Sequence, residues 1–70
     1  MTATTRKQAE REFVNAGRAF AKACGIRWPG GEMAQSILLG DLCRWAERSD
    51  LPQAVRLCNA DLALAKVRSK

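Results

Sequence analysis

The apolar residues near the start of the chain recur at alternating intervals of four and three positions. They are Ala9, Phe13, Ala16, Phe20 and Ala23. At about 100° per residue this spacing keeps them on one face, which predicts an amphipathic helix over about residues 5–24. Thr5 and Gln8 have the spacing of a capping box at its start, and Gly25 suits the left-handed position after its last turn.

A loop and a second amphipathic helix follow. The segment GIRWPGG, residues 25–31, breaks the pattern because proline disfavours helix at Trp28 and paired glycines have high chain entropy. Trp28 then either folds back as a lid on the core or stands exposed as a contact residue. The next helix is predicted over about residues 32–49, with apolar residues over about half of its circumference. It therefore needs two neighbours, and Gly40 would let another backbone approach closely.

A third helix is predicted over about residues 51–67. Asp50 can cap it, Pro52 suits its first turn, and Gln53 completes a variant of the capping box. The main apolar stripe again has four-three spacing and consists of Leu51, Val55, Cys58, Leu62 and Ala65. The residues that widen this apolar side are Ala54, Leu57 and Leu64.

These patterns predict an all-α fold, in which three short amphipathic helices form one domain over residues 1–70. A chain of this length buries only about 60% of its unfolded surface, so its own core is marginal. We therefore expect a homodimeric helical bundle, with the second helix at the interface. The residues predicted at that interface are Leu39, Leu42, Cys43 and Ala46.

The cysteines do not indicate another source of stability. Cys24, Cys43 and Cys58 lie 19 and 15 residues apart and form no C-x-x-C pair, and the chain has no histidine. This pattern favours three small apolar thiols in a reducing cytosol over a disulfide framework or a metal site. No apolar run approaches the length of a membrane span, and the N-terminus lacks a signal-peptide pattern. We expect a cytoplasmic protein without cofactor, metal or membrane contact.

The formal net charge of +5 is unevenly distributed. Residues 1–27 carry six Lys or Arg and two Glu, residues 28–65 carry three bases and five acids, and residues 66–70 carry three bases. Four cations share one side of the first helix: Lys7, Arg11, Arg18 and Lys22. This basic stripe is either a solvated helix face or a contact for phosphates or an acidic surface. A small helical DNA-binding protein or transcriptional regulator is therefore the alternative function, although no helix spares a clear polar face for reading bases.

The sequence lacks residues and motifs that are typical of common catalytic sites. It has no histidine, no phosphate-binding loop and no dinucleotide-binding turn, and its few acidic residues suit helix faces and caps. A non-enzymatic interaction domain is expected instead. Trp45 is the candidate partner-binding anchor, because tryptophan is enriched at interface hot spots. Its predicted companions on one helix face are Leu38, Asp41 and Arg48. The alternative is that Trp45 packs inside its own protomer.

The whole chain, and chiefly the segment GGEMAQSILLGDLCRWAERSDLPQAV (residues 30–55), resembles small early proteins of temperate bacteriophages. More narrowly it is similar to the phage quorum-sensing anti-activators, which are short helical proteins that dimerise. The resemblance implies a non-enzymatic inhibitor that binds a host LuxR-type transcription activator at its DNA-binding domain. It also implies a second target, the ATPase that powers type IV pilus assembly. The resemblance assigns no individual residue a role.

Overall fold

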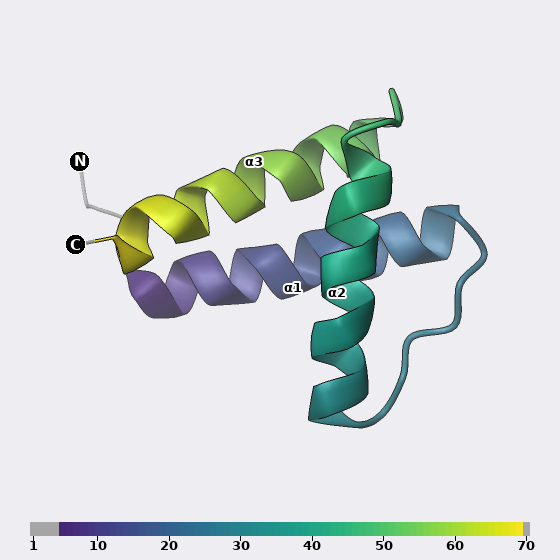
Figure 1. Ribbon diagram of the computed structural model, residues 1–70, viewed down its shortest axis with the longest axis horizontal. Coiled ribbons are helices and arrows are strands. Elements are labelled where there is room, and N and C mark those ends of the chain that lie inside the picture. Colours follow the sequence, from purple (N-terminus) through teal and green to yellow (C-terminus); the bar gives the residue numbers. More distant parts are fainter. Residues whose placement is uncertain (1–4, 70) are drawn as a thin grey trace.

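The computed structural model describes residues 5–69, which form three helices and no strand. They are α1 (Arg6–Ala23), α2 (Glu32–Ala46) and α3 (Pro52–Arg68). α1 and α3 lie side by side and antiparallel, and α2 crosses both near the end of α1 and the start of α3 (Figure 1). The predicted all-α class is confirmed. No helix in the described part of the chain is both long and apolar enough to cross a membrane.

The predicted ends of α1 are confirmed in detail. The Thr5 hydroxyl accepts a hydrogen bond from the Gln8 backbone N–H at 3.1 Å, and the Gln8 side chain accepts one from the Thr5 N–H at 3.1 Å. At the other end Gly25 has a φ of +74°, and the Ile26 N–H donates to the Ala21 carbonyl at 2.8 Å. This geometry ends the helix because only glycine enters the left-handed region without strain.

The junction between α2 and α3 differs from the prediction. α2 ends at Ala46, and the N–H groups of Arg48 and Ser49 bond carbonyls three residues back, which tightens the chain into a turn. The N-cap of α3 is Leu51 rather than Asp50, so the predicted capping box there is wrong. The Ser49 hydroxyl instead accepts the Leu51 N–H at 3.3 Å. Pro52 does occupy the first turn, where its missing N–H costs nothing.

The core lies where the three helices meet. Its largest fully buried side chains are Phe20, Leu42 and Leu57, one from each helix. The predicted face of α1 is largely confirmed, since Ala9, Ala16 and Phe20 are buried and Phe13 is half-buried against the cluster. Ala23, at the end of that stripe, is exposed.

Only part of the predicted apolar side of α3 enters the core: Ala54, Leu57 and Leu64, which were predicted to widen it, are buried. The stripe of four-three spacing points outward: Leu62 is 62% exposed, Val55 51% and Leu51 43%. The buried residues of α3 are Ala54, Leu57, Ala60 and Leu64. Small alanines allow α1 and α2 to approach α3 closely, so the helix buries the side that carries them and leaves its larger aliphatic side chains outside.

Two helical glycines have opposite surroundings. Gly40 is exposed with nothing within 4 Å of an added Cβ, so the predicted close approach at Gly40 is wrong. Gly17 on α1 is buried, and an added Cβ there would overlap the Leu39 side chain of α2 and lie 3.8 Å from the Trp28 ring. The close contact between helices is therefore made at Gly17.

Alanine substitutions at these two glycines are expected to change stability in opposite directions. Gly40→Ala should raise the free energy of unfolding by about 0.5–1 kcal/mol, because it gains helix propensity without a steric cost. Gly17→Ala should lower it, because displacing Leu39 costs about 1–3 kcal/mol and outweighs that gain. Urea denaturation followed by circular dichroism measures both. Equal shifts in one direction would contradict this assignment of the helix contact.

Candidate functional site

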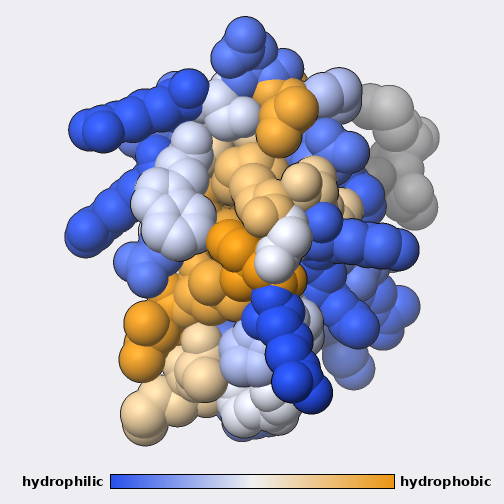
Figure 2. Space-filling model, turned by 90° about the vertical axis from the view of Figure 1, so that its right-hand side faces the viewer, coloured by the Kyte–Doolittle hydropathy of each residue, from blue (hydrophilic) through white to orange (hydrophobic). Residues whose placement is uncertain are grey.

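The outer face of α2 carries large apolar side chains that no other part of the described chain covers. Met33 is 79% exposed, Ile37 63% and Trp45 50%. Figure 2 shows orange and tan side chains in a band across one end of the molecule, with blue hydrophilic side chains on both sides. Exposed apolar surface of this kind, rimmed by charge, is typical of a protein-binding site.

Trp45 lies among charged side chains at the C-terminal end of this face. Together with Arg44, Glu47 and Arg48 it lines a shallow hollow of about 280 Å³. The indole therefore has an apolar surface to bury and charged groups beside it that stay hydrated at a rim. Trp45 is therefore not buried inside the protomer, which was one of the two positions predicted for it.

The other predicted partner-binding residues are only partly brought together with Trp45. Arg48 lines the same hollow, and Asp41 is exposed one turn earlier on α2. Leu38 is half-buried and packs against the core cluster, so it supports the face from beneath. Arg44 and Glu47, which complete the hollow, were not among the predicted site residues, although sequence spacing alone places Arg44 next to Trp45 and Arg48 on the outer side.

The residues predicted at a dimer interface lie mostly inside the protomer. Leu42 is fully buried, and Ala46 and Leu39 are 3% and 8% exposed. These three side chains pack against the protomer's own α1 and α3, so they have almost no surface left for a second subunit. The interface assigned to them needs this correction, and any dimer contact must use other residues.

Cys43, the fourth predicted interface residue, is half-buried beside Cys58 of α3. Burial, together with the neighbouring Asp61, Cys58 and Glu47, raises the pKa of the Cys43 thiol to about 11. At neutral pH this thiol is therefore protonated, which suits a packing residue rather than a nucleophile or a metal ligand. Within residues 5–69 no three cysteine or acidic side chains converge on a possible metal site.

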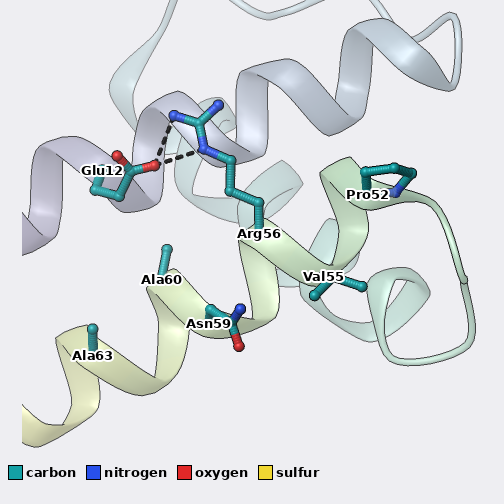
Figure 3. Close-up of a pocket in the computed structure, with 7 residues that line it drawn as sticks. All are labelled: Glu12, Pro52, Val55, Arg56, Asn59, Ala60 and Ala63. Carbon is teal, nitrogen blue, oxygen red and sulfur yellow. Dashed lines mark hydrogen bonds and ion pairs between the residues drawn. The ribbon is translucent and has the colours of Figure 1, made fainter.

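The free side of α3 forms a second apolar surface. Between α1 and α3 it borders a groove of about 430 Å³ lined by Pro52, Val55, Asn59, Ala60 and Ala63 (Figure 3). Across the groove Arg56 Nε donates a hydrogen bond to a Glu12 carboxylate oxygen at 2.7 Å, and a terminal guanidinium nitrogen forms an ion pair with the same oxygen at 2.7 Å. Both side chains are half exposed, so this ion pair contributes only about 0–1 kcal/mol to stability.

The basic stripe of α1 reaches the loop that carries Trp28. Arg18 and Lys22, two of its four exposed cations, line a hollow of about 360 Å³ together with Ala19, Ile26 and Trp28. The Arg18 guanidinium lies 5.9 Å from the centre of the Trp28 ring, within cation–π range. Trp28 is half-buried and packs against the core, so the loop folds back over the helices as the lid prediction required.

These surfaces combine apolar and charged side chains. They offer exposed apolar residues, arginines and one accessible indole, without a converging acid, base and nucleophile among the described residues. Comparison with known protein families, with characterised proteins and with solved structures finds no match for this chain.

Proposed function

We propose that the protein is a non-enzymatic inhibitor that acts by binding another protein through the outer face of α2. The observation that carries this proposal is the exposure of Trp45, half open to solvent within a ring of charged side chains. A large aromatic side chain costs free energy when it stays hydrated and gains several kcal/mol when a partner buries it. Met33 and Ile37 extend the same face and enlarge the apolar area that a partner covers.

The proposed target is the DNA-binding domain of a host LuxR-type transcription activator, with the type IV pilus assembly ATPase as a second target. The resemblance of residues 30–55 to phage anti-activators supports both. The charge distribution supports the activator's DNA-binding domain as a target, because residues 28–65 carry three bases and five acids although the chain as a whole is basic. DNA-binding domains are basic, so the excess of acidic residues in this segment complements such a surface.

A binding assay tests this function directly. The purified protein is titrated into a complex of the activator's DNA-binding domain with fluorescently labelled promoter DNA, and anisotropy is followed. Release of the DNA, together with a protein–protein complex seen by calorimetry, is expected. Absence of any complex with the DNA-binding domain would contradict the proposed target.

We also propose a homodimer, formed through α3 rather than through the buried residues of α2. The outward stripe begins at Leu51, the N-cap of α3, and continues along α3 through exposed Val55, Leu62 and Ala65 and half-buried Cys58; its four-three spacing is that of a coiled-coil seam. In a parallel pair of such helices, Asp61 of one copy lies opposite Lys66 of the other. The reason is that a residue flanking the seam of a parallel coiled coil pairs with the residue five positions later on the second helix. Asp61 and Lys66 are both exposed, and neither takes part in an ion pair within the described chain.

The dimer is expected to depend on Val55 and Leu62. Light scattering at tens of micromolar should give the mass of two chains, and Leu62→Glu should give the mass of one with unchanged helicity, because a carboxylate cannot be buried unpaired in a seam. In a parallel pair Cys58 meets its own copy. Diamide should therefore link two chains of a Cys24→Ser/Cys43→Ala variant through Cys58, whereas a monomer mass for the unmutated protein would contradict the dimer.

A further inference from the structure

We propose that the protein has a second binding site, for single-stranded nucleic acid, where the basic stripe of α1 meets Trp28. One base stacks against the indole in the hollow lined by Ala19 and Ile26, and the adjoining phosphates contact Arg18 and Lys22. The rest of the strand follows the stripe toward Arg11 and Lys7. This site is separate from the α2 face, because the two hollows share no residue.

The first reason for this assignment is that no acidic side chain of the described residues pairs with the cations of the basic stripe. α1 holds two acidic residues, and both are engaged elsewhere: Glu10 with Arg6 at 3.2 Å and Glu12 with Arg56 at 2.7 Å. Lys7, Arg11, Arg18 and Lys22 are all exposed, and no ion pair within residues 5–69 includes them. A linear array of free cations attracts a polyanion, and its counterion release favours binding.

The shape of the array is the second reason. At 1.5 Å per residue the stripe extends about 22 Å along the helix axis, and its four cations project within about 60° of one another. A phosphate backbone presents its charges along a line in the same way. An acidic protein surface spreads its charges over an area, which a single narrow row of cations contacts poorly.

The third reason is the aromatic side chain at the end of the row. Proteins that bind single strands combine a cationic track with aromatic side chains on which bases stack, because every base offers a π-face. Trp28 is held by its contact with the core, so its ring is already ordered before a strand binds. The Arg18 guanidinium lies over the same ring, 5.9 Å from its centre, so a base that stacks there displaces it from the ring toward the adjoining phosphate.

The test uses the full chain and a labelled oligothymidylate of about 16 nucleotides, the upper end of common single-strand site sizes. Fluorescence anisotropy should show binding that weakens steeply with added salt. Arg18→Glu/Lys22→Glu should lower the affinity at least about tenfold and flatten the salt dependence. The matched control, Arg44→Glu/Arg48→Glu at the C-terminal end of α2 and in the turn after it, changes the net charge equally and should have little effect. Equal losses in the two variants would overturn the site, because they would indicate attraction by net charge alone.

Further measurements separate stacking from charge and this site from the α2 face. In a Trp45→Phe background, the oligonucleotide should quench the remaining fluorescence of Trp28, whereas poly-glutamate should not. Quenching by neither, or competition by poly-glutamate at the same charge concentration, overturns the nucleic-acid assignment. Duplex DNA that binds as tightly as the single strand overturns it as well. The Arg18→Glu/Lys22→Glu variant should still bind the activator's DNA-binding domain, so failure of one proposal is distinguishable from failure of the other.

Discussion

Replacement of Trp45 by alanine is expected to lower the affinity for the partner at least about 30-fold, or about 2 kcal/mol, while the protein stays folded. The indole is half exposed and belongs to no part of the buried cluster, so its removal leaves no cavity in the core. The same removal takes away the largest side chain on the outer face of α2. Calorimetric titration with the activator's DNA-binding domain measures the affinity, and circular dichroism checks the fold.

Two control variants make this experiment decisive. Trp28→Ala removes the other tryptophan, which packs against the core, and is expected to lower the free energy of unfolding. Arg18→Glu/Lys22→Glu changes a surface away from α2 and should leave partner affinity nearly intact. If Trp45→Ala unfolds the chain, the indole belongs to the core. If the variant folds and binds normally, the α2 face is not the interface.

The sequence predicted those features of the fold that depend on neighbours along the chain. The capping box of Thr5 and Gln8 and the left-handed Gly25 formed as expected, because each is made of residues within one turn of one another. The start of α2 at Glu32 was also predicted, since the preceding glycines and proline leave few alternatives. The Asp50 cap failed because α3 begins one residue later, with Leu51 as its N-cap, and no side chain caps the helix there.

The choice between apolar faces could not be predicted in the same way. α3 has one side rich in large aliphatic residues and another that combines Leu57 and Leu64 with alanines, and periodicity favours the first. The structure buries the second, because two helices must pack against α3 at once and only small residues let both backbones approach. The candidate site depends on this choice. Trp45 is exposed because Leu42 and Ala46 of the same helix fill the space beneath α2.

The sequence also does not indicate which of the two helical glycines, Gly17 or Gly40, is buried. Nothing in the local sequence of Gly17 distinguishes it from Gly40, since both stand inside helices between polar and apolar neighbours. Only the crossing of α2 over α1 brings Leu39 onto Gly17 and leaves Gly40 open. Packing between elements distant in the chain therefore decided which glycine has a structural role.

The largest effect on stability is expected for the substitution of Leu57 by alanine, and the same substitution at Leu62 is the matched control. Both are leucines in α3, five positions apart, and leucine and alanine differ little in helix propensity. Leu57 has no exposed surface and belongs to the core cluster, which contains residues of all three helices, whereas Leu62 is 62% exposed. Leu57→Ala should therefore lower the free energy of unfolding by about 2–5 kcal/mol, through lost burial and a residual cavity.

That loss is a large share of the stability of so small a domain, so partial unfolding of Leu57→Ala at room temperature is expected. Leu62→Ala should change the free energy of unfolding of the monomer by no more than about 0.5 kcal/mol. Urea denaturation at low micromolar concentration measures both variants while dimer formation contributes little. At high protein concentration the difference in stability between the unmutated protein and Leu62→Ala should increase. The unmutated dimer gains stability by mass action, whereas this variant loses part of its seam. If the two substitutions destabilised the monomer equally, the outward stripe of α3 would belong to the core after all.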